Sequence, residues 1–161
     1  MKMKKVVLGI LLGVGLLSFS SISMAQDASV TKSACDYLTP EKINSVLGPT
    51  VSQDSKNSSN NSCYYLDSRL GSDPLKKYVA EINLFGPRTN EEFNMEYKAA
   101  LAKGAKSIEV EGGLSYEAEA PDGIPSVFFF KNGIYGEVVV HGQDQNQAKA
   151  EALAKLVVNK L

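Results

Sequence analysis

The chain has 161 residues, of which 17 are basic and 18 are acidic, so its formal charge at neutral pH is −1. Nucleic acid and anionic lipid surfaces attract proteins through clustered Lys and Arg, and this balance argues against both as partners. One histidine and two cysteines are few ligands for a zinc site, so no metal or other cofactor is expected.

Residues 1–25 have the three parts of a secretory signal peptide: a basic start, the apolar stretch Val6–Leu17 and a small-residue end. The apolar stretch is shorter than the roughly 20 residues that span a bilayer, so no integral anchor is expected after cleavage. Three basic residues lie in the signal, which leaves 14 basic and 18 acidic side chains and a formal charge of −4. Residues 26–34 are expected to be a flexible lead-in, and residues 35–161 a single domain, periplasmic or secreted.

Cys35 and Cys63 are the two cysteines. Exported chains meet oxidising conditions, and two cysteines allow one intramolecular pairing, which predicts a disulfide. The competing interpretation is a redox or metal pair, but the chain lacks a C-x-x-C spacing.

The first half of the domain predicts one helix and two strands. The segment Thr39–Glu41 is typical of a helix N-cap and first turn, and the helix is expected to end at Gly48. Thr50–Ser62 is almost wholly polar, which predicts a mobile loop because the segment has little apolar surface to bury. Strands are expected at Cys63–Leu66 and Lys77–Phe85.

The second half predicts a helix, four strands and a final helix. Thr89 and Glu92 form a capping-box pattern, and this helix is expected to end at Gly104. Asn132-Gly133 between two apolar runs indicates a hairpin with a type I′ turn. The remaining expectations are strands at Ser107–Val110, Ser115–Ala120, Ser126–Phe130 and Ile134–Val140, and a helix that begins near Asp144 with Gln147 as its box partner. Its inward side is expected to carry Ala148, Leu153, Leu156 and Val157.

This order of elements predicts an α+β fold. It fits one antiparallel sheet of about five to six strands with helices on one face and one disulfide.

Two aromatic groups on predicted strands form a candidate binding surface. Successive side chains of a strand point to opposite faces, so Tyr64 separates from Tyr65, and Phe129 separates from Phe128 and Phe130. One side of each group is then core. The other side is either a partner surface or a second apolar layer under a helix.

His141 is the only histidine and follows an apolar strand directly. Imidazole titrates near neutrality, so His141 is a candidate base, but no nucleophile pattern such as G-x-S-x-G accompanies it. We therefore assign no catalytic residue and keep His141 as a candidate surface residue beside the aromatic groups.

Short motifs extend over most of the mature chain: Cys35-x-x-Leu38-Thr39-x-Glu41, Leu47-Gly48, Cys63-x-Tyr65 and Glu111-Gly112-Gly113-Leu114. This pattern resembles a group of small bacterial secreted proteins and lipoproteins of unknown function. The resemblance implies an α+β domain with paired cysteines and supplies no catalytic residues. Members often carry a lipobox cysteine, which this chain lacks, so membrane tethering is not carried over.

The leading functional hypothesis is a non-enzymatic exported domain that binds another protein, such as an inhibitor or immunity protein. A small acidic domain is suited to block a partner's site by electrostatic complementarity. The alternative is a carrier of a small apolar ligand or envelope lipid, which would need an apolar cavity between sheet and helices. The third hypothesis is an enzyme that uses His141.

Overall fold

The computed structural model describes residues 32–70, 78–119, 123–142 and 145–161. The predicted signal peptide and most of the predicted lead-in lie outside these ranges. The helices are α1 (Pro40–Leu47), α2 (Asn90–Ala102) and α3 (Asn146–Val158), with 3₁₀ turns η1 (Ala34–Tyr37) and η2 (Ser68–Leu70). The strands are β1 (Val51–Gln53), β2 (Ser62–Asp67), β3 (Tyr78–Pro87), β4 (Lys106–Ser107), β5 (Leu114–Glu119), β6 (Pro125–Lys131) and β7 (Ile134–Val140). None of the helices in the described part of the chain is long and apolar enough to cross a membrane.

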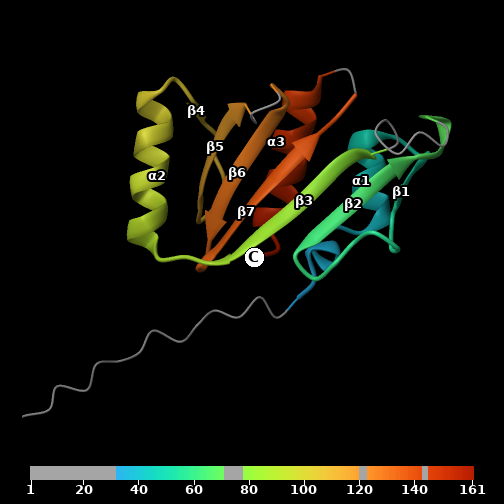
Figure 1. Cartoon of the computed structure of the whole chain (residues 1–161), viewed down its shortest axis with the longest axis horizontal. Coiled ribbons are helices and arrows are strands. Elements are labelled where there is room, and N and C mark those ends of the chain that lie inside the picture. Colours follow the sequence, from blue (N-terminus) through green and yellow to red (C-terminus); the bar gives the residue numbers. More distant parts are fainter. Residues whose placement is uncertain (1–31, 71–77, 120–122, 143–144) are drawn as a thin grey trace, which may run out of the picture.

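The strands form one sheet in the order β1-β2-β3-β7-β6-β5-β4, and every neighbouring pair is antiparallel (Figure 1). The β3–β7 pairing joins the two halves of the chain in the middle of the sheet. At the β6–β7 turn, Asn132 has φ 52° and Gly133 has φ 79°, which confirms the predicted type I′ turn. The antiparallel α+β fold is confirmed, with seven strands in place of the expected five to six.

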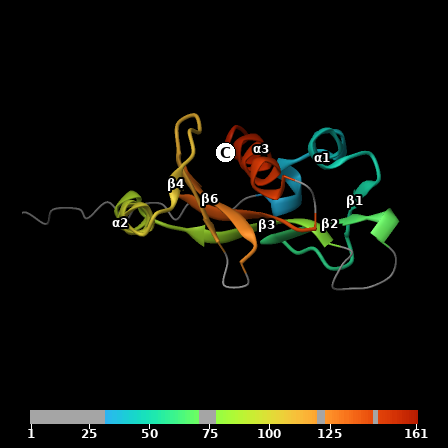
Figure 2. The same cartoon turned by 90° about the horizontal axis from the view of Figure 1, so that it is seen from above.

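Helices α1 and α3 cover one face of the sheet (Figure 2). Ile82 of β3, Val138 of β7 and Phe129 of β6 point to this side and are completely buried. Gly136 lies among them because a Cβ atom there would come within 2.4 Å of the Phe129 ring and 2.7 Å of the Asn83 carbonyl oxygen. The packing of Phe129 under α3 therefore requires glycine at position 136.

Helix α2 packs against the opposite face, over β5 and β6. Its Phe93 is completely buried and stacks on Phe130 of β6 with ring centroids 5.0 Å apart. Because Phe130 and Phe129 are successive residues of one strand, α2 and α3 lie on opposite sides of β6. In Figure 2, β4 lies between α2 and α3. The expectation of helices on one face holds for α1 and α3 but not for α2. The run Phe128–Phe130 makes both faces of β6 apolar, so a helix packs on each face.

The polar segment predicted as a mobile loop, Thr50–Ser62, is ordered by hydrogen bonds and contributes the extra strand, β1. Asp54 accepts bonds from the backbone N–H groups of Lys56 and Asn57 and from the Tyr78 hydroxyl, at 3.2, 3.3 and 3.0 Å. The Ser58 hydroxyl accepts a bond from the backbone N–H of Tyr64 at 3.0 Å. The prediction of a mobile loop was wrong because it counted apolar burial alone, while short polar side chains satisfied the backbone of this turn.

The predicted disulfide is present and joins Cys35 of η1 to Cys63 of β2, with the two Cα atoms 5.0 Å apart. Ser33 caps η1 by accepting a bond from the Cys35 N–H, and Ala34 is completely buried. The last residues of the predicted lead-in therefore belong to the folded domain.

Strands β2, β5 and β6 differ from their predicted bounds by one residue, β3 extends two residues further, and two elements differ more. Strand β4 begins one residue before the predicted Ser107–Val110 and already ends at Ser107. Helix α3 begins after Gln145, which has φ 60°, and Ala148 on its first turn is exposed, while the expected partner Asp144 lies outside the described residues. The buried side of α3 consists of Ala150, Leu153, Ala154, Val157 and Val158, a helical spacing that includes two of the residues expected there.

Candidate functional site

The residues predicted to form a binding surface point to different faces of the sheet, because side chains alternate along a strand. Tyr65 and Phe129 are 2% and 0% exposed in the core under α1 and α3, and Phe130 is 4% exposed beneath α2. Tyr64, Phe128 and His141 are half-buried. The predicted separation of alternate residues is confirmed, and three residues of the set stay accessible while three are core.

Strands β2, β3 and β7 are covered by α1 and α3 on one side only. On their other side, α2 covers the Tyr135 end of β7, and β2 and β3 carry no helix in the described part of the chain (Figure 2). We call this surface the open face. It is formed by Tyr64 of β2, Glu81 and Phe85 of β3, and Glu137 and His141 of β7. At its edge lies Phe128 of β6, whose ring stacks on those of Tyr116 and Tyr135 in the aromatic layer under α2.

The strand register places each carboxylate of the open face directly beside an aromatic residue. Tyr64 of β2 is paired with Glu81 of β3, and Phe128 of β6 is paired with Glu137 of β7. Directly opposed residues of an antiparallel pair have Cβ atoms about 4.5 to 5.5 Å apart on the same face. The open face and its edge therefore hold two aromatic and carboxylate pairs side by side.

His141 lies at the end of β7, and its Nε2 is 3.1 Å from Oε1 of Glu81. The side chains of both residues are 25% exposed. Glu81 is the kind of carboxylate partner that the enzyme hypothesis requires for His141. His141 lies on the strand surface, however, and does not line the groove described below.

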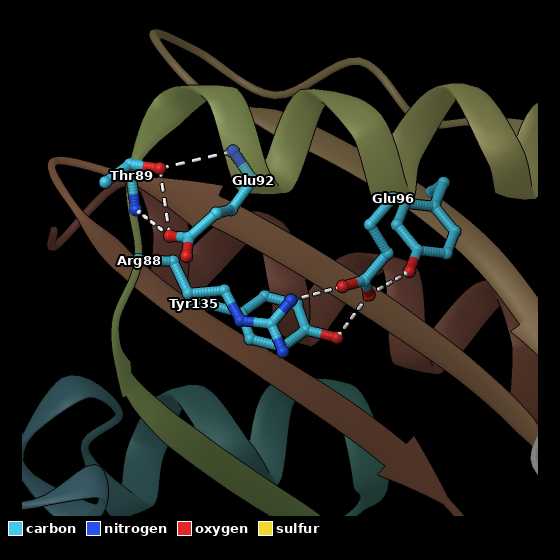
Figure 3. Close-up of polar contacts among 6 residues, drawn as sticks. Arg88, Thr89, Glu92, Glu96 and Tyr135 are labelled. Carbon is cyan, nitrogen blue, oxygen red and sulfur yellow. Dashed lines mark hydrogen bonds and ion pairs between the residues drawn. The ribbon is translucent and has the colours of Figure 1, made fainter.

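Phe85 and Arg88 form the border between the open face and α2. Phe85 is 50% exposed, and its ring centroid lies 5.1 Å from that of Tyr135. The Arg88 guanidinium lies over the same Tyr135 ring, 4.1 Å from its centroid, and pairs with Glu96 of α2 (Figure 3). The border thus consists of an exposed ring, a buried ring and a stacked cation.

Glu96 joins α2 to the sheet. Its Oε1 accepts hydrogen bonds from the hydroxyls of Tyr116 and Tyr135 at 2.8 and 2.7 Å, and its Oε2 pairs with Arg88 (Figure 3). At the start of the helix, Thr89 and Glu92 form the predicted capping box. Both oxygens of Glu96 are engaged, so this cluster holds α2 in place over the aromatic layer.

The cluster shifts the pKa values of its members. Burial raises the pKa of Glu96, but the bonds from Tyr135, Tyr116 and Arg88 outweigh burial and hold it below its ordinary value. Burial, and then the bond to Glu96, raise the pKa of Tyr116 and of Tyr135 well above the ordinary value. The carboxylate is therefore ionised and both phenols are neutral hydrogen-bond donors at neutral pH.

Sequence reasoning did not identify this cluster. The available signal was spacing, since Glu96 lies three residues after Phe93 and four before Ala100, and this spacing places it on the same side of a helix as these two apolar residues. A charged residue within an apolar helix stripe indicates a buried partner, but its identity depends on the sheet.

Replacing Glu96 with glutamine is expected to lower the free energy of unfolding at pH 7 by about 1 kcal/mol, because its hydrogen bonds lose their charge assistance. The pKa of Glu96 is lower in the folded than in the unfolded chain, so its ionised form stabilises the fold above the unfolded pKa, about 4.3. This contribution is lost as the pH falls through the folded pKa.

Urea unfolding of both proteins between pH 7 and pH 3 measures the effect, and the difference between them should shrink with acidification. Asp67, whose pKa is also lowered by its bond with Arg69, is present in both proteins and cancels from the difference. Glu91→Gln, an exposed change on the same helix, is the matched control. A Glu96→Gln difference that is independent of pH would contradict the assignment.

A groove of about 780 Å³ lies between α2 and strands β4 and β5, and it is open to solvent. Small residues form much of its wall, and Glu96 and Tyr116 also line it. The wall residues used below are Ala99, Ala100, Ala105, Ala118 and Pro125, with Lys103 and Lys106 among the charged ones. Elsewhere in the described ranges, no three His, Cys, Asp or Glu side chains come together in a way that would hold a metal ion.

No protein-family model matches the chain, and no curated protein matches it significantly. The resemblance to small bacterial secreted proteins therefore stays a prediction.

Proposed function

We propose that this protein is an exported, non-enzymatic domain that binds another protein through the open face. The observation that carries the proposal is Phe85, a large apolar side chain that is 50% exposed on the open face. The uncovered face of an antiparallel sheet is commonly polar, whereas aromatic residues are enriched at protein interfaces. Half-buried Tyr64 lies on the same face, and half-buried Phe128 lies at its edge.

The disulfide is compatible with an oxidising compartment, and together with the predicted signal peptide it supports a periplasmic or secreted location. A disulfide-braced domain offers a pre-ordered surface, which reduces the entropy lost on binding. An inhibitor or immunity protein is the form of this function that the acidic mature chain favours, since electrostatic complementarity gives specificity and speeds association.

A photo-crosslinking amino acid, p-benzoylphenylalanine, placed at Phe85 and expressed in the exporting host is expected to capture one discrete protein. Met95, which is 62% exposed on α2, is the matched control position because it is an exposed apolar residue away from the open face. The captured protein is then purified, and its affinity is measured with the Phe85→Ala and Met95→Ala variants.

Phe85→Ala is expected to weaken binding about tenfold or more, as for a central interface residue, and Met95→Ala by less than about twofold. Equal capture from both positions, or an affinity that is unaffected by Phe85→Ala, would exclude the open face as the binding surface.

The groove supports a second candidate function, the carrier of a small apolar ligand or envelope lipid. Its volume lies in the range of small-molecule sites, and its wall contains several alanines and a proline. Native mass spectrometry of the protein purified from the exporting host separates the two functions. A carrier retains a lipid mass that is lost when Ala99→Leu and Ala118→Leu fill the groove, and a protein-binding domain does not.

A further inference from the structure

A buried hydrogen-bond donor lies on the wall of the groove beside α2. The side-chain nitrogen Nε2 of Gln147 is buried and has no hydrogen-bond partner among the described residues. Five buried side-chain atoms lack a partner in this part of the chain, and that of Gln147 is the only one of them on the groove wall. An unpaired buried donor is costly, because it has lost its bonds to water without replacement. A ligand in the groove that offers an acceptor atom would supply the missing bond.

The predicted role of Gln147 in capping α3 does not account for this nitrogen. A glutamine in a capping box accepts a bond from a backbone N–H group through its side-chain oxygen. The side-chain nitrogen carries two hydrogens and only donates. Its missing partner is therefore an acceptor, whether or not the oxygen caps the helix.

The groove includes the ends of α2 and β5 and the starts of β6 and α3, which Figure 1 shows at the same end of the sheet. Lys103 follows α2 directly, Pro125 is the first residue of β6, and Gln147 is the second residue of α3. Ala99 of α2 and Ala118 of β5 belong to the small apolar part of the wall. The groove thus combines an apolar wall with a buried donor that needs an acceptor.

The charged residues of the groove are balanced. Lys106 lies 3.7 Å from Glu117, while Lys103 and Glu119 are both exposed. Glu96 already has both of its carboxylate oxygens engaged by Tyr116, Tyr135 and Arg88. Because the wall has no excess of either charge, a carbonyl oxygen on an apolar chain fits it without requiring a net charge on the ligand.

Resting on the carrier candidate above, we propose that the groove binds a single acyl chain whose carbonyl oxygen accepts a hydrogen bond from Nε2 of Gln147. The chain contacts the small apolar residues of the wall, and the carbonyl oxygen satisfies the buried donor. An acyl group is the chemistry that a free fatty acid and a lipid ester share, so the experiment has to separate these two sources.

The probes are decanoate, methyl decanoate and decylammonium, each at a concentration below that of micelle formation. The three have alkyl chains of similar length, but an ammonium group donates only and offers no acceptor. Binding to the full mature chain is followed by NMR chemical-shift changes. Both acyl probes are expected to shift resonances of α2 and β5 and the side-chain amide of Gln147, and decylammonium is expected to bind about tenfold more weakly.

Gln147→Glu keeps the size of the side chain and an oxygen that can cap α3, but it replaces the donor with an acceptor. The variant is expected to bind methyl decanoate about tenfold more weakly and decylammonium more tightly than the wild type. Gln53→Glu makes the same change at an exposed position of β1 outside the groove, and it should alter both affinities less than twofold.

A wild-type protein that binds decylammonium as tightly as methyl decanoate would overturn the proposal, as would an unchanged preference between these probes in Gln147→Glu. Shifts that map away from the groove would also overturn it. The comparison of the three probes on the wild-type protein keeps the test valid if the variant folds poorly.

Decanoate and methyl decanoate separate the two sources of the acyl group. Equal affinities for both support the proposal with a lipid ester as the ligand. Tighter binding of decanoate that is lost in Lys103→Gln supports it with a free fatty acid, because Lys103 is the exposed cation of the groove that has no ion pair among the described residues.

The carrier function and the carbonyl contact fail in different ways. Equal binding of all three probes in the groove, together with a lipid retained from the exporting host, would leave the carrier function and exclude recognition of a carbonyl group. No binding of any probe in the groove and no retained lipid would remove the carrier function itself.

Discussion

Replacing Cys35 and Cys63 together with alanine is expected to lower the free energy of unfolding by about 3 to 4 kcal/mol. The disulfide closes a segment with a sequence separation of 28 residues, and the chain-entropy relation gives this value for a loop of that length. The segment contains α1 and β1, which are a short helix and a three-residue edge strand. Such elements have little stability of their own, so a covalent link across them has a large effect.

Equilibrium urea unfolding of the wild-type and double-alanine proteins measures this difference. Reduced wild-type protein loses the bond but keeps both sulfur atoms, so comparison with the double variant separates the two effects. Cys63 is completely buried, so some of the loss in the variant comes from packing and will be absent from the reduced protein. A total change below about 1 kcal/mol would show that the segment is held by its hydrogen bonds alone.

The sequence predicted the elements that depend on local patterns. The Thr89 and Glu92 capping box, the Asn132-Gly133 turn and the end of α1 at Gly48 are set by residues within a few positions of one another. The cysteine pair could also be predicted, because two cysteines in a chain with a predicted signal peptide have one intramolecular pairing. These features need no knowledge of how the sheet is assembled.

The parts that sequence reasoning missed depend on contacts between distant segments. Strand β1 is short and polar, and it is a strand because β2 pairs with it and because Asp54 and Ser58 complete the turn between them. The position of α2 on the second face follows from Phe130 and Tyr116, which meet Phe93 only after β5 and β6 have paired.

The candidate site was predicted only in part, because it also depends on contacts between distant segments. Alternation along a strand separated Tyr64 from Tyr65 and Phe128 from its neighbours, but it did not show which side would lack a helix. Glu81 and Glu137 become members of one site only through the β3–β7 register, and these residues are 56 positions apart in the chain. A single sequence contains no local signal for that pairing.

Replacing Phe93 with alanine is expected to lower the free energy of unfolding by about 3 to 5 kcal/mol, the range for large buried aromatic residues. Phe93 is the one fully buried residue of α2, and its ring lies 5.0, 5.4 and 6.1 Å from the rings of Phe130, Tyr135 and Tyr116. A cavity at this point removes the ring contacts of α2 with all three of these strand residues.

The Glu96 cluster cannot replace this apolar contact. Its hydrogen bonds depend on α2 lying close to Tyr116 and Tyr135, and Phe93 sets that distance from one turn earlier in the helix. Urea unfolding should therefore show the full loss in Phe93→Ala, and hydrogen exchange should show faster opening of α2 than of α3. Met95→Ala on the exposed side of the same helix is the control and should change the stability by less than about 0.5 kcal/mol. If Phe93→Ala costs no more than Met95→Ala, the polar cluster alone holds α2 on the sheet.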